Sequence, residues 1–290
     1  MPTDTRRNQG PENTQSYRQW LKKENPVFED VLKEIINSDK IRADGRGCED
    51  QRKIYMKTHI VTQAKGSAYL ELNRTKVIVS VFNPREIPRL SEFTPNGELY
   101  CEFKFAPFSC PERRGHLMDG EEKDLSVLLR HALEPAVCRH EFPNFQVDIY
   151  ALVLDNDGSC LSAAITAAGL ALADAGIPMY DLITSVTMCI HNDNIFVDPS
   201  LEEETFCKTF FKNKTNEMGI ISLSYMPTLG QVAELTQTGC VKKDTVLKSL
   251  DLLISKCVKL STLCQHCLIE DVKDRLKESD SNKDEEMKVS

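Results

Sequence analysis

The chain has 290 residues, of which 41% are apolar, so it can bury a substantial core as one large domain or as two fused halves. It has no run of about 18 apolar residues that would predict a membrane span, and its N-terminal stretch lacks the apolar segment of a secretory signal. The net charge of −8 argues against a protein that coats nucleic acid by itself. The eleven cysteines do not show the regular spacing of a disulfide-linked framework, which is typical of reduced thiols.

Composition divides the chain into three parts. Residues 1–40 form a polar N-terminal arm, whose one amphipathic stretch favours a helix that packs on the body. The apolar positions of that stretch are Val27, Val31, Leu32, Ile35 and Ile36. The folded body is expected over residues 41–277, and the acidic tail, residues 278–290, is too polar to fold alone and is predicted to be disordered.

The first half of the body is predicted to contain strands and one amphipathic helix. Residues 65–82 alternate apolar and polar side chains around Asn73-Arg74, which predicts a hairpin. A proline-containing loop over 83–98 leads to a strand over 99–105. Apolar residues at spacings of three and four predict a helix over 124–138, and a strand over 147–153 follows.

The stretch from Ser159 to Leu182 predicts a central buried helix. Five alanines and Gly169 leave part of its surface nearly flat, so another backbone can approach it closely. Asp157 or Ser159 can cap its start, and Gly176 can end it. The remaining predicted elements follow in chain order: a strand over 182–190, short strands near 195–198, 219–226 and 232–235, and a long helix over about 242–276.

Two groups of side chains could bind a metal. Cys257, Cys264, His266 and Cys267 favour zinc by residue type, but they lack a second close pair, so a cysteine-lined apolar helix face is the preferred interpretation. The acidic run 202–204, together with Asp198, could hold magnesium, although such runs usually form a solvated loop.

Two pairs of arginines could contact phosphates. Arg85 and Arg89 lie four residues apart on the proline-containing loop, and Arg113 and Arg114 form a second pair. A solvated surface is an equally good interpretation of each pair alone. The sequence has no glycine-rich phosphate loop and no recognisable nucleophile–histidine arrangement.

Four stretches resemble the RNase PH family: DGR at 44–46, AKGSAYLELNRTKVIVSVFNPRE at 64–86, LLRHALEPAV at 128–137 and AAITAAGLALADAGIPMYDL at 163–182. Together with DPSLEEE at 198–204, they are most similar to one type of eukaryotic RNA exosome ring subunit. The resemblance implies an α+β fold of the ribosomal protein S5 domain 2 type, with mixed sheets and packed helices over the RNase PH-like domain, residues 41–277. It also implies a ring of six related chains around a pore that admits single-stranded RNA.

Active members of this family cleave RNA from its 3′ end with inorganic phosphate, which needs cations for phosphate and acidic groups for protons or a metal. The resemblance places Gly120 and Glu121 where arginines are expected, with Lys123 as the only nearby base. The acidic pair Glu203 and Glu204 is followed by an insertion and then by an apolar residue, Ile220, where a further aspartate is expected. We therefore expect an inactive homologue that has no catalytic residues, no metal and no cofactor.

The resemblance leaves RNA guidance and assembly as the expected function. Arg85 and Arg89 match a pore-facing loop of ring relatives, and Arg113 and Arg114 are further RNA-binding candidates. Expected partners are other RNase PH-like ring subunits, RNA-binding cap subunits, an associated catalytic nuclease and single-stranded RNA, in the nucleus with its nucleolus and in the cytoplasm. Two alternatives stay open: an active phosphate-dependent 3′-to-5′ exoribonuclease that uses Lys123, Glu203 and Glu204, and a protein unrelated to RNA on the same fold.

Overall fold

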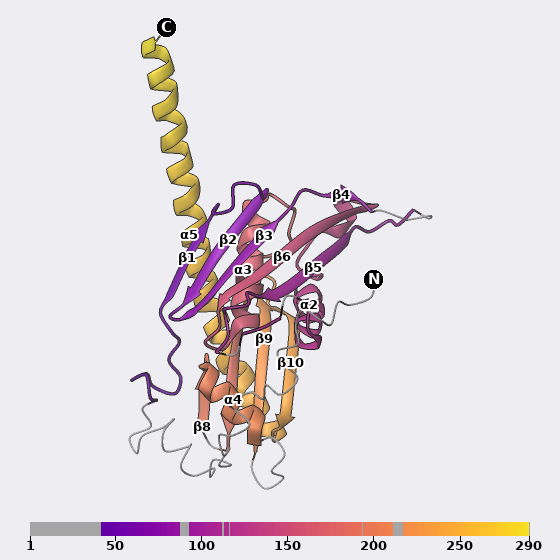
Figure 1. The fold of residues 1–290 in the computed structure, drawn as a ribbon, viewed down its shortest axis with the longest axis vertical. Coiled ribbons are helices and arrows are strands. Elements are labelled where there is room, and N and C mark those ends of the chain that lie inside the picture. The colour runs from indigo at the N-terminus through magenta and orange to yellow at the C-terminus, as the bar shows by residue number, and fades with distance from the viewer. Residues whose placement is uncertain are drawn as a thin grey trace, which may run out of the picture.

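The computed structural model describes residues 42–87, 93–111, 113–115, 117–192, 194–210 and 217–289. Over these residues the chain forms two sheets with four α-helices, a mixed α+β architecture as expected (Figure 1). The predicted N-terminal helix and Arg89 lie outside the described residues.

The first sheet has the order β1-β2-β3-β6-β4, and β5 pairs in parallel with β6. Its strands are β1 (Ile54–Thr58), β2 (Gly66–Leu72), β3 (Thr75–Val81), β4 (Arg85–Glu86), β5 (Glu98–Phe105) and β6 (Phe145–Asp155). The predicted hairpin is confirmed: β2 and β3 pair antiparallel, and Asn73 takes the positive φ of 55° that the tight turn between them requires. Alternate side chains of these strands enter the core because successive residues of a strand point to opposite faces.

The second sheet has the order β10-β9-β7-β8, and the helices pack on both sheets. Its strands are β7 (Thr184–His191), β8 (Asn194–Val197), β9 (Met218–Met226) and β10 (Gln231–Cys240). The helices are α2 (Gly120–Leu133), the 3-10 helix η3 (Arg139–Glu141), α3 (Cys160–Asp174), α4 (Leu201–Phe210) and α5 (Lys243–Val289).

Helix α3 is the buried centre of the molecule, as its sequence predicts. Gly169 lies so close to Ile183, the residue before β7, that an added Cβ would be 2.9 Å from its carbonyl oxygen. On another side, the backbone of Gly66 approaches Ala171 and Ala175. The small residues therefore let two neighbouring backbones pack directly on the helix.

Several elements differ from the sequence prediction. Helix α2 begins at Gly120 rather than near residue 124, because the buried carboxylate of Glu122 accepts the Asp119 N–H at 2.9 Å and fixes the first turn there. The acidic run lies in helix α4 instead of a solvated loop. Strand β1 was not predicted, because it is defined by its pairing with β2 and not by a pattern in its own residues. Helix α5 runs from Lys243 to Val289, beyond its predicted end near residue 276.

One face of α5 is buried against β1, β7 and β9. Cys257 and Cys264 lie fully buried on this face, and burial raises the pKa of both thiols to about 12. Both side chains belong to the main hydrophobic core, which fits the interpretation preferred from the sequence, that they are small apolar core residues. Over Lys243–Lys277, α5 is long and apolar enough to cross a membrane, but the core helix of a folded domain has the same properties.

Candidate functional site

Helix α2 begins where the family resemblance places the phosphate-binding cations. Glu121 lies in its first turn, and its Oε2 atom accepts a hydrogen bond of 2.8 Å from Nη2 of Arg114. The Arg114 guanidinium also stacks 4.1 Å from the ring centroid of Phe105. Lys123 is therefore not the only base nearby, which corrects the sequence interpretation. Arg114 is nevertheless committed to Glu121, and the side chain of this arginine is only 19% exposed.

The N-terminus of α3 provides backbone N–H groups and a positive dipole end, which together favour a bound anion. The turn before the helix is built from Gly158 and Ser159, whose φ angles are +84° and +53°. The Ser159 N–H donates to Oε1 of Glu204 at 2.6 Å. A carboxylate of the protein itself therefore occupies the anion position at this helix. Ser159 stands at the N-cap position as predicted, but its hydroxyl donates to the carbonyl of Pro199 instead of capping the helix.

Helix α4 carries the acidic pair, and each carboxylate has a structural partner. Glu204 is 9% exposed and pairs with Lys208 at 3.5 Å, in addition to its bond with Ser159. Glu203 accepts the Ser200 N–H at 2.9 Å and lies 3.5 Å from the Arg42 guanidinium. Burial raises the pKa of Glu203, and the charge of Arg42 opposes that shift only in part. The acidic run therefore forms neither the solvated loop nor the magnesium site suggested by the sequence. The described residues contain no group of three or more histidine, cysteine, aspartate or glutamate side chains that could hold a metal ion.

The position expected to carry the second acid is apolar. Ile220, on β9, is 9% exposed and belongs to a compact second core cluster. The other buried members of that cluster are Cys189, Phe196, Phe206, Cys207 and Met218. A carboxylate at residue 220 would be desolvated here without a partner, which is strongly unfavourable.

A buried ion pair holds the turn before α4 in place. Arg52 and Asp198 are 4% and 5% exposed, and two guanidinium nitrogens of Arg52 contact the two carboxylate oxygens at 2.9 and 2.6 Å. Arg52 also donates to the carbonyl oxygens of Asp157 and Gly158, so it ties this turn to the start of α3. Burial alone raises the pKa of Asp198, but the hydrogen bonds and charge of Arg52 outweigh it and hold the pKa below the ordinary carboxyl value. Sequence reasoning missed this pair, although the arginine-rich stretch 42–52 was a signal.

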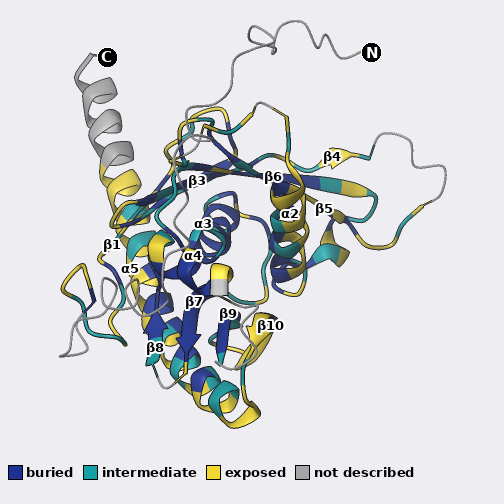
Figure 2. Cartoon of the chain, turned by 60° about the horizontal axis from the view of Figure 1, so that its bottom comes forward, coloured by how far each residue is buried: buried dark blue, intermediate teal, exposed yellow. Residues whose placement is uncertain are grey.

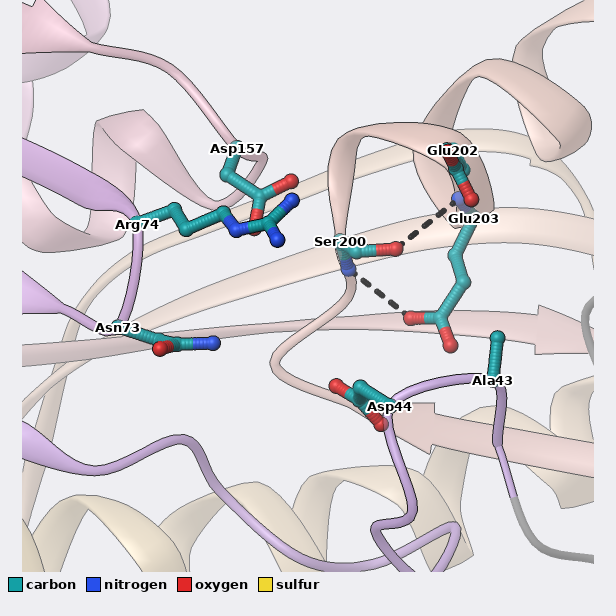
Figure 3. Close-up of a pocket in the computed structure, with 8 residues that line it drawn as sticks. All are labelled: Ala43, Asp44, Asn73, Arg74, Asp157, Ser200, Glu202 and Glu203. Carbon is teal, nitrogen blue, oxygen red and sulfur yellow. Dashed lines mark hydrogen bonds between the residues drawn. The ribbon is translucent and has the colours of Figure 1, made fainter.

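A cleft of about 270 Å³ lies beside this turn, between the β2–β3 turn and the start of α4 (Figure 3). It is lined by Ala43, Asp44, Asn73, Arg74, Asp157, Ser200, Glu202 and Glu203. Figure 3 shows Arg74 reaching toward Asp157, while the carboxylate of Glu203 turns back to the Ser200 backbone. With four carboxylates and one arginine, the cleft repels a phosphate group.

The predicted RNA-binding arginines have different environments. Arg85 lies on β4 with 54% of its side chain exposed, and its Nε atom is 2.7 Å from Oδ2 of Asp148 on β6. Arg113 is exposed, whereas Arg114 is paired with Glu121 as described above. Arg89 lies outside the described residues. Of the three arginines that the structure describes, Arg85 and Arg113 are the exposed ones.

The chain resembles known proteins over most of its length. The profile of the 3′ exoribonuclease family, domain 1, matches residues 50–178. The Arabidopsis thaliana exosome complex component RRP41-like is 37% identical over 244 residues, which cover 84% of this chain and 88% of the relative. Mouse exosome complex component MTR3, the subunit type that the sequence stretches resemble, is 32% identical over 289 residues, covering 93% and 96%.

Solved structures share the fold. A chain of the Archaeoglobus fulgidus exosome with RNA bound to the active site superimposes with a TM-score of 0.67 at 24% identity, covering 81% of this chain and 96% of that chain. Rice Rrp46 superimposes with a TM-score of 0.64 at 22% identity, covering 77% of this chain and 98% of that chain. At these identities the likeness establishes the fold, and the two sequence relatives establish common ancestry.

Proposed function

Because the chain belongs to the RNase PH family of 3′ exoribonucleases, we propose that it acts as a non-catalytic ring subunit of an RNA exosome. In this role it supports 3′-to-5′ RNA processing and degradation by completing the ring and guiding single-stranded RNA through the pore. Its partners are other RNase PH-like subunits, cap subunits and a separate nuclease, in the nucleus, the nucleolus and the cytoplasm.

The observation that supports the non-catalytic role most directly is Glu121 in the first turn of α2, where it pairs with Arg114 at 2.8 Å. Phosphorolysis must hold a phosphate ion beside the RNA phosphate, and only positive groups can offset their mutual repulsion. At the start of α2, where the resemblance places the phosphate-binding cations, Glu121 neutralises Arg114. The further aspartate expected for the reaction is also missing, because its position is taken by Ile220 in an apolar cluster.

The purified full chain is expected to release no nucleoside diphosphates from 3′-tailed RNA when inorganic phosphate is supplied. Losing one electrostatic contact to the reacting groups costs on the order of 10²–10³ in rate, and several contacts are missing here. The products would be measured by chromatography with and without phosphate, next to a Glu203→Gln variant as a control for contaminating nuclease. Phosphate-dependent release by the natural chain above that control would establish the alternative, an active exoribonuclease.

Strand β10 supports assembly into a larger particle. It is the edge of the second sheet, it is ten residues long, and it exposes Val232 and Leu235 without a lysine or proline to protect the edge. Such an edge can accept a strand from another chain. We assign it to contact with a neighbouring RNase PH-like subunit.

Replacing Arg85 and Arg89 together by glutamate is expected to weaken the protection of single-stranded RNA by the assembled ring roughly tenfold or more, because two phosphate contacts become repulsive. Assembly should persist because the Arg85 side chain is more than half exposed, and it is measured in parallel because the substitution also removes the cation beside the buried Asp148. The matched control is Arg130→Glu, because the Arg130 side chain on α2 is 51% exposed. Equal RNA protection by the double variant and the control would refute the guidance role of this loop.

A further inference from the structure

Among the residues that the structure describes, no helix covers one face of the first sheet. Helices α2 and α3 pack on one side of it, and the described part of the chain places no helix on the other side (Figure 2). On β6, for example, Ile149 and Ala151 are buried in the core, whereas Tyr150 and Leu152 point outward and are partly exposed. An open sheet face is available for a ligand or a partner.

Three aromatic rings meet on this outer face. Phe82 directly follows β3, Tyr150 lies on β6 and Tyr100 lies on β5, so the rings come from three neighbouring chain segments. The rings meet edge to face: the centroids of Phe82 and Tyr150 are 5.6 Å apart with ring planes at 81°, and those of Tyr100 and Tyr150 are 6.2 Å apart with ring planes at 63°. Tyr100 is 44% exposed, and the other two rings are partly buried. We call Phe82, Tyr100 and Tyr150 the aromatic platform.

The platform adjoins the exposed arginine of the predicted RNA loop. Asp148 precedes Tyr150 by two residues on the same face of β6 and stands opposite Tyr100 in the sheet register. Its Oδ2 atom is 2.7 Å from Nε of Arg85, so the guanidinium is held at the border of the platform. The carboxylate is further satisfied by Gln146, whose Nε2 donates to its Oδ1 at 2.6 Å.

We propose that the aromatic platform is a base-stacking site for single-stranded RNA, on which Tyr100 and Tyr150 contact bases while Arg85 contacts the adjoining phosphate. Aromatic side chains on adjacent strands of an open sheet are a common way to bind unstacked bases without strict sequence preference. The inference rests on the proposed RNA-guiding function and adds a place where RNA is held outside the pore loop.

The charged groups around the platform decide whether it would bind RNA through stacking or through charge. Asp148 pairs with the Nε atom of Arg85, whose side chain stays 54% exposed, and Glu102 is the acid on β5 beside Tyr100 in the same row of outward side chains. Burial raises the pKa of Tyr100 and of Tyr150, and neighbouring carboxylates add to both shifts, so both phenols stay protonated at neutral pH. The platform should therefore contribute through stacking, which depends little on salt, and Arg85 should contribute through charge.

The test measures the affinity of a fluorescent oligouridine for the native complex that contains the full chain, over a series of salt concentrations. Tyr100→Leu keeps an apolar side chain but removes the aromatic face, so affinity should fall about fivefold or more while the salt dependence stays unchanged. Arg85→Gln should reduce the slope of log affinity against log salt by about 0.7, the value for one phosphate contact on a single strand. Tyr55→Leu is the control, because Tyr55 lies on the far edge strand of the same face and is 56% exposed.

The possible results distinguish a failure of the platform proposal from a failure of the proposed RNA-guiding function. A changed slope for Arg85→Gln with unchanged affinity for Tyr100→Leu would overturn the platform and leave RNA guidance standing. Unchanged binding by both variants would contradict both proposals. If Tyr100→Leu instead prevented assembly while the complexes that still formed bound RNA normally, the face would be a protein contact and the RNA platform would be wrong.

Discussion

Substituting methionine for Arg52 is expected to lower the free energy of unfolding by about 3–5 kcal/mol, the usual cost of removing one partner of a buried ion pair. Asp198 would remain buried at 5% exposure with only the more distant Arg46, at 3.8 Å, as a cation, and the carbonyl oxygens of Asp157 and Gly158 would lose a donor. Urea unfolding followed by circular dichroism measures the change. Because this pair joins the segment before β1 to the turns at α3 and α4, the variant should also lose protection from hydrogen exchange there.

The control for this prediction is Arg130→Met, which removes an exposed arginine from its pair with Glu134 on α2 and should cost about 0.5 kcal/mol or less. In the double variant Arg52→Met with Asp198→Asn, part of the lost stability should return, because no uncompensated charge remains buried. Asparagine also tolerates the positive φ of 54° at this position. If the two Arg52 variants were equally unstable, the cost would come from lost packing and not from charge.

The destabilisation should depend on pH with a defined sign. In the natural protein Asp198 has a lowered pKa, so its contribution is present above the unfolded carboxyl value of about 3.9 and is lost as pH falls through the lower folded value. In Arg52→Met, the backbone N–H of residue 52 and the charge of Arg46 still oppose burial, but the hydrogen bonds and charge of the Arg52 side chain are lost. The pKa of Asp198 therefore rises, and acid relieves the buried charge. The stability difference between the two proteins should therefore shrink as pH is lowered from 7 toward 4.

Replacing Gly66 by alanine should destabilise the protein by about 3 kcal/mol, at the upper end of the usual cost of overpacking. The new Cβ would lie 2.3 Å from the backbone nitrogen of Ala175 and 2.4 Å from the carbonyl oxygen of Ala171. Both atoms belong to the end of α3, which is held on its other side by Ile183, so the backbone has little room to move. A thermal melt of the two proteins measures the effect.

Gly120→Ala provides the matched control, because an added Cβ there meets no atom within 4 Å. Gly120 is the first residue of α2, where alanine favours helix, so stability should be unchanged or slightly higher. Equal melting temperatures for the Gly66 and Gly120 variants would mean that α3 and β2 can separate at no cost, contrary to the close packing described above.

Sequence patterns predicted the elements whose signals are local. The alternation around Asn73 gave the β2–β3 hairpin, and the small residues around Gly169 gave the buried helix α3. Strand β1 and the true start of α2 were missed because each depends on a partner outside its own stretch, β2 in one case and the buried Glu122 in the other. The acidic run was assigned to a loop because its charges suggested solvent, whereas Glu203 and Glu204 are buried with partners.

The family membership and the apolar residue at the expected acidic position, Ile220, were determined by the sequence alone. Only the tertiary structure decided where the charges go: Glu204 reaches Ser159 across 45 residues, and Asp198 reaches Arg52 across 146. The physical reason is that apolar periodicity acts over a few neighbouring residues of one element, whereas a buried charge must find its counter-charge wherever the fold provides one.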